Sequence, residues 1–362
     1  MGTLRRQLKS LAGVGGVYAL WVVGLLVFTS LYGYTFLWLG RVLWSALAGG
    51  NDEFANAPVP RIVTWFIGFV VVYESYHWLF PVGEWPFLQR AARSMLTKYP
   101  YFRLNACIFE EELEQNERRA EHQTKMVLRS VTLACDQMTP FAKPQESAMY
   151  AIHPHGVLSC GPLVNGIHHA KFAEVKARWL VAENLFWFPV IRDVLKWWNF
   201  SHVQRWSFVE AMEKQQNIGF CPGGFEEATL YERGKHRVFL KKRFGFIKLA
   251  LQYGYKVHPV YTFGEEFTYH AFPYFLDFRL KLNEFKFPGV AFMGNVWCFF
   301  MPKSDIELIT VVGKPLQFPR IEHPAKADVA KYHELYVNAL IELFETHKTQ
   351  FAANPDATLE VY

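Results

Sequence analysis

The sequence predicts an α/β domain that an N-terminal pair of apolar helices anchors in a membrane. Residues 11–83 hold only five formal charges, whereas residues 84–362 hold 63 in 279 positions, close to the roughly one in four of soluble proteins. In this second part, short β-rich runs alternate with helix-compatible stretches, and polar or glycine-rich loops follow the runs. We therefore expect a basic tail at 1–10, a membrane hairpin at 11–83 and a globular domain at 84–362.

The composition excludes a disordered or collagen-like chain, because 51% of the 362 residues are hydrophobic and 17% are aromatic. The net charge of +5 is small and its basic residues are dispersed, so we expect no nucleic acid partner and favour a membrane surface. An odd number of widely spaced cysteines, without a zinc motif or a disulfide framework, favours a reducing compartment. These cysteines are Cys107, Cys135, Cys160, Cys221 and Cys298.

The first apolar stretch covers 31 uncharged residues, 10–40. Because roughly 20 apolar residues suffice to cross a bilayer as a helix, we expect a spanning helix near 14–39. The alternative is a cleaved signal peptide, suggested by the basic N-terminus and by Ala46-Leu47-Ala48. The apolar stretch is about twice as long as the core of a signal peptide, which favours the membrane helix.

The second apolar stretch, 62–82, completes the expected hairpin. Its aromatic residues suit a membrane interface, but Glu74 and His77 interrupt it. Ionisable residues at this depth usually face protein or water, so Glu74 marks either a contact or a segment that dips into the membrane and returns. A single span, with 62–82 lying flat on the far leaflet, is the alternative.

The distribution of basic residues predicts the orientation of the hairpin. The connection at 41–61 carries two Lys or Arg residues, whereas three precede the first apolar stretch and four follow the second. Since basic flanks remain on the cytosolic side, both termini and the globular domain are expected in the cytosol. Asn199-Phe200-Ser201 is the chain's only glycosylation sequon, and we expect it to carry no glycan.

The globular part is expected to form an α/β sheet with ligands at the strand ends. Strands are expected at 149–152, 179–182, 218–221, 257–263 and 308–312. Helices are expected at 110–121, 207–215, 245–253 and 328–351. The last of these is the clearest, because its apolar residues recur at helical spacing after Pro324.

His153-Pro154-His155-Gly156 is the sharpest local signal for chemistry. A histidine that directly follows a short strand, in a loop kept tight by Pro and Gly, is well placed to act as a general base. The alternative is that both histidines are polar loop residues hydrogen-bonded to backbone. A metal site with His168 and His169 is disfavoured, because no carboxylate or cysteine is suitably interleaved.

A second signal is Pro222-Gly223-Gly224-Phe225-Glu226-Glu227. Glycines after a strand expose backbone N–H groups to an oxyanion or a phosphate, and the carboxylates that follow can orient an imidazole. The alternative is a plain turn into a helix with acidic residues in its first turn. The basic cluster at 235–243 is either a solvated face or a site for the phosphates of a nucleotide-bearing donor.

Taken together, these blocks resemble the acyl-CoA:diacylglycerol acyltransferase type 2 family, which includes monoacylglycerol and wax-alcohol acyltransferases. The resemblance rests on His-Pro-His-Gly at 153–156, Gly-Gly-x-x-Glu at 223–227, Arg-x-Gly-Phe at 243–246, and blocks at 259–265, 310–315, 332–336 and 343–348. It extends over nearly the whole chain. Two family elements are altered here, at Tyr101-Phe102-Arg103 and Gly294-Asn295-Val296, which leaves the acceptor substrate open.

The resemblance implies a glycerolipid-acyltransferase-like mixed sheet flanked by helices, in an enzyme of the endoplasmic reticulum membrane. Lipid droplets are the alternative location. The implied reaction transfers a fatty acyl group from acyl-CoA to diacylglycerol and forms triacylglycerol, without a metal or cofactor. A monoacylglycerol or fatty-alcohol acyltransferase is the alternative within enzymes, and oligomerisation stays open. Outside enzymes, the alternative is a hairpin-anchored lipid-droplet protein that binds neutral lipid.

The reaction needs one base, because an alcohol must lose its proton as it attacks a thioester, while a thiolate leaves readily. We assign this base to His155; His153 supports the loop and Glu227 orients the imidazole. Gly156, Gly223 and Gly224 are expected to present backbone to the carbonyl oxygen. The residues expected to hold CoA phosphates are Arg243, Lys242, Arg192 and Arg205. A covalent route through Cys160 is the rival mechanism.

Overall fold

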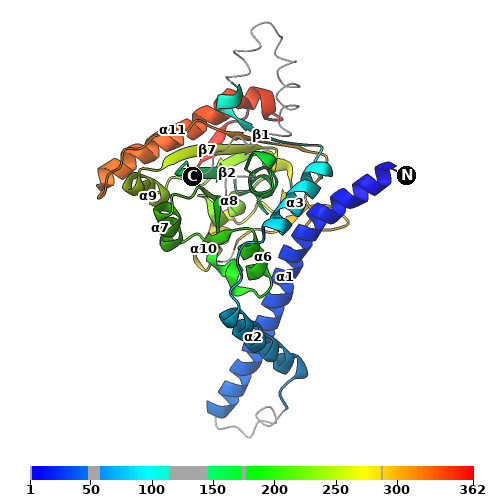
Figure 1. Ribbon diagram of the computed structural model, residues 1–362. Coiled ribbons are helices and arrows are strands. Elements are labelled where there is room, and N and C mark those ends of the chain that lie inside the picture. The colour runs from blue at the N-terminus through cyan, green and yellow to red at the C-terminus, as the bar shows by residue number, and fades with distance from the viewer. Residues whose placement is uncertain (1, 48–57, 114–145, 173–176, 287) are drawn as a thin grey trace.

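The computed structural model describes residues 2–47, 58–113, 146–172, 177–286 and 288–362. Figure 1 shows a central sheet with helices around it, from which two helices project away. The helix expected at 110–121 lies mostly outside the described residues, as does Cys135.

A seven-stranded mixed sheet forms the centre of the domain. Its order is β1 (Leu104–Phe109), β10 (Glu307–Val312), β7 (Lys256–Phe263), β2 (Ala148–His153), β5 (Ile218–Phe220), β3 (Arg178–Val181) and β4 (Phe200–His202). The five strands from β7 to β4 are parallel, β10 is antiparallel to β7, and β1 is parallel to β10. The predicted mixed sheet is confirmed.

All five predicted strands are present, each within one residue of its expected ends. The strands that sequence reasoning missed are β1, β4 and those of two small sheets. These small sheets pair β6 (His236–Val238) with β11 (Leu359–Val361), and β8 (His270–Ala271) with β9 (Phe292–Met293). Most of the missed strands have two or three residues, too few to display an alternating pattern.

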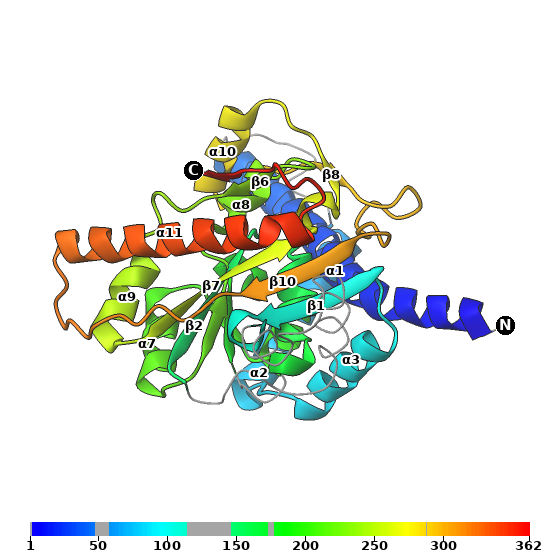
Figure 2. The same ribbon diagram turned by 90° about the horizontal axis from the view of Figure 1, so that it is seen from above.

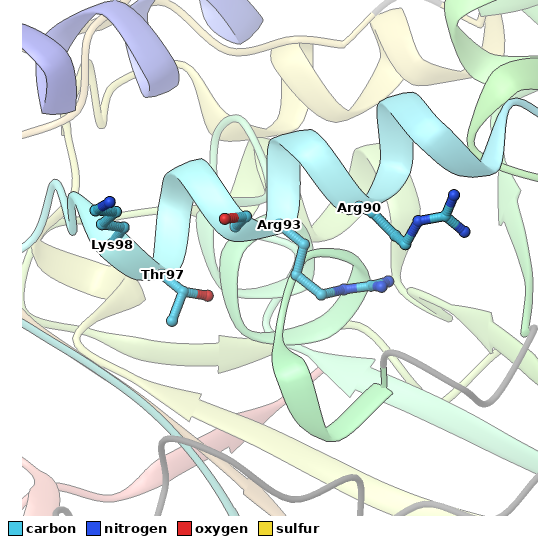
Figure 3. Close-up of a pocket in the computed structure, with 5 residues that line it drawn as sticks. Arg90, Arg93, Thr97 and Lys98 are labelled. Atoms are coloured by element: carbon cyan, nitrogen blue, oxygen red, sulfur yellow. The ribbon is translucent and has the colours of Figure 1, made fainter.

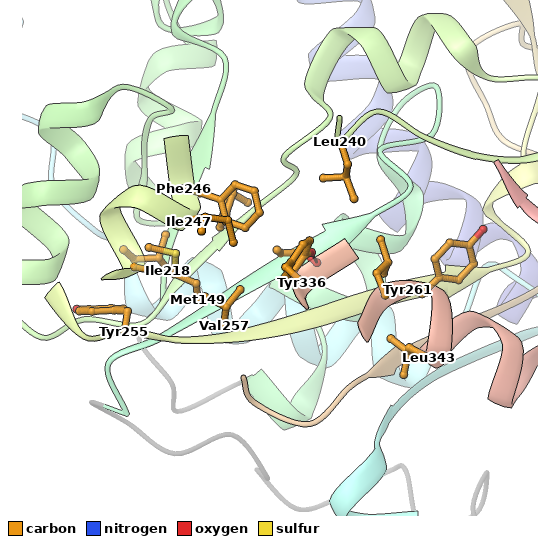
Figure 4. Packing of buried hydrophobic residues seen from close by; sticks show 14 of the residues in the cluster. Met149, Ile218, Leu240, Phe246, Ile247, Tyr255, Val257, Tyr261, Tyr336 and Leu343 are labelled. Atoms are coloured by element: carbon orange, nitrogen blue, oxygen red, sulfur yellow. Dashed lines mark hydrogen bonds between the residues drawn. The ribbon is translucent and has the colours of Figure 1, made fainter. Parts of the chain in front are cut away.

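The main core lies between one face of the sheet and three helices, α7 (Arg205–Glu213), α9 (Gly245–Tyr253) and α11 (Lys326–Phe351). Along β2, Met149 and Ala151 belong to this core, whereas Tyr150 and Ile152 pack on the opposite face, as the alternation of a strand requires. Figure 4 shows Tyr336 of α11 and Phe246 of α9 meeting over the central strands. Helix α9 matches its prediction, while α7 and α11 begin two residues earlier than expected.

Two helices, α1 (Gly2–Leu47) and α2 (Arg61–Leu79), are long and apolar enough to cross a membrane, by length and composition. They cross in Figure 1. The ring centroids of Tyr32 on α1 and Phe66 on α2 lie 5.0 Å apart. Val14 and Tyr18 of α1 are buried against the globular domain, whereas the Phe36 and Trp44 side chains are more than two-thirds exposed. The expected span at 14–39 thus begins where the helix still packs on the domain. A membrane hairpin stays a prediction.

The polar residues that interrupt the second apolar stretch contact α6 (Ile191–Trp197). Glu74 lies 3.2 Å from Arg192, and His77 Nε2 lies 3.2 Å from Asp193. A charged residue in an apolar helix is tolerated when it has such a partner. Glu74 therefore marks a contact between α2 and the globular domain, one of the two roles that the sequence allowed.

Candidate active site

The order of the sheet gathers three loops at one edge. Strands β5, β2 and β7 are adjacent and parallel, so the loops at 222–227, 154–161 and 264–266 all leave from the same ends of neighbouring strands. Figure 1 shows β2 and β7 side by side, with α8 (Gly224–Leu230) beside them. Because of this topology, both sequence motifs and a third loop form one site.

His153 is sealed inside this site. Its side chain is fully buried, and its Nδ1 lies 2.7 Å from Oε1 of Glu227, which is also buried. On the other side of the ring, Nε2 lies 3.1 Å from the Tyr336 hydroxyl of α11. A carboxylate only accepts, so Nδ1–H donates to Glu227, while the Tyr336 hydroxyl lies within reach of both Nε2 and, at 3.4 Å, the Ala151 carbonyl. His153 is thus held rigidly and out of reach of a substrate.

Glu227 accepts three N–H donors, one of which belongs to the loop at 154–161, which we call the histidine loop. Besides His153, its carboxylate accepts the backbone N–H of His155 at 2.7 Å and that of Phe239 at 3.0 Å. Buried carboxylates need such donors, because an unpaired buried charge is costly. The sequence led us to expect that Glu227 orients the imidazole of the base. In the structure its ring partner is His153, and it positions His155 through the backbone.

The His155 imidazole is partly exposed, unlike that of His153. Its Nδ1 lies 2.9 Å from the Gly156 carbonyl, so Nδ1–H donates there and Nε2 carries the lone pair. The Ser159 hydroxyl lies 3.3 Å from Nε2 and 3.4 Å from Nδ1, so it is a hydrogen-bond partner of this ring. Burial among protein atoms lowers the pKa of the His155 imidazole. The lower pKa favours the neutral imidazole, which is the form that a general base requires.

Two glycines permit this close packing. Gly156 has φ +66°, and a Cβ there would overlap the carboxylate of Glu265. A Cβ on Gly223 would overlap the carboxylate of Glu227. The loops that carry the two motifs thus approach buried carboxylates so closely that only glycine fits.

Glu265 holds the rest of the histidine loop, a role that sequence reasoning did not assign. Its two oxygens accept the backbone N–H groups of Cys160 at 3.2 Å and Gly161 at 2.6 Å. Burial raises the pKa of Glu265 to about 8, against the opposite effect of these two donors. Its position after β7, behind a glycine as in the 222–227 loop, is the signal that could have identified it. Tyr336 and Ser159 were likewise given no role in the site.

Cys160 is poorly suited to act as a nucleophile. Its side chain is fully buried, and burial raises the pKa of its thiol. Its Sγ lies 3.0 Å from the Tyr18 hydroxyl of α1, so the thiol is packed between the histidine loop and that helix. This environment favours direct attack on the thioester over an acyl-cysteine route.

The four basic residues expected at CoA phosphates do not gather in one place. Arg243 lies at the site, where it donates to the Gly223 carbonyl at 3.2 Å and pairs with Glu226. Lys242 is exposed beside it. Arg192 instead forms the ion pair with Glu74, and Arg205 is exposed at the start of α7.

A separate basic hollow lies along α3 (Pro86–Lys98). It has a volume of about 410 Å³ and is lined by Arg90, Arg93, Ser94, Thr97 and Lys98 (Figure 3). Helix α3 packs on α1, where the Met95 side chain approaches Gly13. Three of the four basic residues after the second apolar stretch are thus gathered on a helix that contacts the first apolar helix.

The family model described as diacylglycerol acyltransferase matches residues 130–362. The chain belongs to the diacylglycerol acyltransferase family. The matched residues contain the whole site, from His153 to Tyr336, but neither apolar helix. The resemblance therefore covers less of the chain than the blocks in the sequence led us to expect.

Individual relatives agree with the family. The chain is 32% identical to diacylglycerol O-acyltransferase 2 of Dictyostelium discoideum, over 60% of this chain and 71% of that protein. It is 34% identical to the human diacylglycerol O-acyltransferase 2-like protein 6, over 58% and 68%, and 31% identical to human diacylglycerol O-acyltransferase 2, over 59% and 60%. Among solved structures, the 1-acyl-sn-glycerophosphate acyltransferase of Thermotoga maritima superposes on 95% of this chain and 98% of its own, with 14% identity and a TM-score of 0.37.

Proposed function

We propose that this chain transfers a fatty acyl group from acyl-CoA to the free hydroxyl of diacylglycerol and so forms triacylglycerol, with His155 as the general base. The family and its relatives support this activity. The observation that carries the role of His155 is the contrast between the two histidines. His153 is fully buried between Glu227 and Tyr336, whereas His155 is partly exposed and its Nε2, with only the Ser159 hydroxyl nearby, is the ring nitrogen that carries no proton.

The proposed reaction is a direct attack. Nε2 of His155 takes the proton of the acceptor hydroxyl as its oxygen forms a bond to the thioester carbonyl carbon. The tetrahedral intermediate then collapses, the carbon–sulfur bond breaks, and CoA leaves as a thiolate that takes up the proton from His155. Because a thiol has a pKa of about 8.5, the leaving group needs little help from an acid. No metal or cofactor takes part in this scheme.

The site also argues against a lipid-droplet protein without an activity. A protein that only holds neutral lipid needs an apolar surface, and it gains nothing from a buried histidine–carboxylate pair. Burying Glu227 and His153 together costs solvation free energy that only well-placed partners offset. Such a cost is typical of active sites, where it positions a reacting group.

We further propose that the protein resides in the endoplasmic reticulum membrane as a multi-pass protein with both termini in the cytosol. Two observations support membrane residence, namely the two apolar helices and the basic residues on α3. A cytosolic site would receive acyl-CoA and a lipid alcohol from opposite phases, water and bilayer.

The test is an acyltransferase assay on membranes with labelled acyl-CoA and a panel of diacylglycerol, monoacylglycerol and fatty-alcohol acceptors. We expect triacylglycerol to be the main product and His155→Ala to lower turnover at least about a hundredfold, as loss of a general base does. His323→Ala is the matched control, because His323 is exposed on a loop outside the site. Activity of His155→Ala within a few-fold of wild type would refute the assignment. A hydroxylamine-sensitive acyl adduct that Cys160→Ala abolishes would instead establish the covalent route.

A further inference from the structure

Six aromatic side chains stand exposed on and beside α10 (Leu276–Glu284), and we call them the aromatic face. They are Trp187, Phe272, Tyr274, Phe275, Phe278 and Phe285, and their exposed fractions run from 46% to 80%. Soluble proteins rarely leave so many large apolar side chains together in water. The aromatic face is therefore expected to contact another molecule or a membrane.

The exposed aromatic residues gather on α10 and at its two ends. Phe278 lies on the helix, Phe275 precedes it with φ +56°, and Phe285 follows it. The same helix also exposes the charged Asp277 and Lys281. Aromatic rings beside charged side chains are typical of surfaces at a bilayer interface, with rings in the lipid and charges in water.

The aromatic face is linked to the apolar helices through the segment at 184–190. The backbone of Trp187 accepts a hydrogen bond from Tyr32 of α1 at 3.4 Å, and the Lys286 carbonyl, just after α10, accepts one from Asn184 at 3.1 Å. Three residues after Trp187, Val190 donates to the Tyr73 hydroxyl of α2 at 3.0 Å. In Figure 1, α10 lies at the end of the domain from which α1 and α2 project, and Figure 2 shows α10 and α2 on opposite sides of that end. Hydrogen bonds thus join the segment that borders α10 to both apolar helices.

The same helix is fixed to the active site. Arg279 of α10 donates to the Thr229 carbonyl at 3.0 Å, and the Thr229 hydroxyl donates to Asn283 at 3.1 Å. Thr229 belongs to α8, the helix that carries Glu227. Helix α10 is therefore hydrogen-bonded to the helix whose Glu227 holds the backbone of His155.

We propose that the aromatic face is a second membrane-contact surface, which rests in the interfacial layer of the bilayer that holds α1 and α2. The globular domain then lies against the membrane, and α8 and the histidine loop are held close to the bilayer. The proposal of a contact surface rests on the exposed aromatic residues and on the hydrogen bonds that link their neighbours to α1 and α2. Its role in supplying a lipid acceptor to His155 rests on the proposed function.

The test uses the full chain reconstituted in vesicles of zwitterionic and anionic phospholipids. An environment-sensitive fluorescent amino acid is encoded in place of Phe278, in place of Phe285, or in place of Leu335 as a control. Leu335 matches them as a half-exposed apolar residue on a helix, but it lies on α11. We expect shallow spin-labelled lipids to quench the probes at 278 and 285 and to leave the probe at 335 unaffected.

Two results would overturn the proposal. Equal quenching at positions 278 and 335 would show that α10 faces water. Blue-shifted emission at 278 without quenching by lipids would show that protein, such as a second copy of the chain, covers the aromatic face. Quenching is independent of turnover, so a quenched probe in a protein without acyltransferase activity would refute the proposed function and leave the contact surface standing.

A second measurement addresses acceptor supply. We expect the triple variant Phe275→Ser, Phe278→Ser, Phe285→Ser to raise the KM for diacylglycerol, expressed as its mole fraction in the vesicle, at least about fivefold. The KM for acyl-CoA, which arrives from water, should stay unchanged, as should both constants in Leu335→Ser. Since the three phenylalanine rings are exposed, their replacement costs the fold little. An unchanged mole-fraction KM would refute the role in acceptor supply.

Discussion

Two histidines separated by one residue have opposite environments in this site. His153 is closed in by Glu227 and Tyr336, and its ring serves to connect β2, α8 and α11. His155 shares the Glu227 carboxylate only through its backbone N–H and keeps a partly exposed ring. His153 is the last residue of β2 and His155 lies in the loop that follows, so their different roles arise from what packs against each ring.

The pH dependence of turnover should report the environment of His155. Burial lowers the pKa of this imidazole, and a general base works in its neutral form. Activity should therefore persist as the pH falls below about 6.5, the usual pKa of histidine, and decline only as the pH passes the lowered value. The measurement is kcat/KM against pH on sealed vesicles. An acid limb above pH 7 would contradict the assignment.

Glycine substitutions test the close approach of the loops to the buried carboxylates. Gly156→Ala and Gly223→Ala should each lower activity at least about tenfold and lower the unfolding temperature, because a Cβ would displace Glu265 or Glu227. Gly245→Ala is the control, since a Cβ at the start of α9 meets nothing within 4 Å. If all three variants lose activity equally, the effect does not come from the carboxylates.

At the scale of elements, the site depends on helices of very different length. The seven-residue α8 carries Glu227, which bonds His153 at the end of β2. Tyr336 contacts the same histidine from the middle of the 26-residue α11, although the two residues are 183 positions apart in sequence. Helix α11 was predicted from the helical spacing of its apolar residues, and Tyr336 is one of these residues. The spacing predicts which face of the helix is buried, but not the hydrogen bond that the Tyr336 hydroxyl makes.

Tyr336→Phe isolates the contribution of α11 to the site. The change removes one hydroxyl and leaves Nε2 of the buried His153 without that partner, which costs about 1–3 kcal/mol of unfolding free energy. We expect a lower unfolding temperature together with reduced turnover. Tyr332→Phe on the same helix is the matched control, because its partly exposed ring packs on Phe318 away from the histidines. Equal stability of the two variants would argue against a structural role for the Tyr336 hydroxyl.

For the whole molecule, the open question is the side of the membrane on which the globular domain lies. The natural sequon is a poor reporter, because the Asn199 side chain donates to the Ala177 carbonyl and is partly buried. Asp356→Asn creates Asn-Ala-Thr in an exposed segment near the C-terminus. In microsomes we expect this variant to carry no glycan, and the region after residue 82 to be open to protease. A glycosidase-sensitive mass shift would place the domain in the lumen.

The sequence by itself determined the apolar N-terminal helices, five strands to within one residue, three helices, the family, and the two motifs of the site. It could do so because hydrophobic spacing and loop residues act over short stretches of chain. Only the tertiary structure decided that His153 is buried and His155 accessible, that Glu227 bonds His153, that Glu265 and Tyr336 complete the loop, and that Arg192 pairs with Glu74. These features depend on contacts between residues tens to hundreds of positions apart, and burial, which fixes hydrogen-bond partners and shifts pKa values, exists only once those residues pack together.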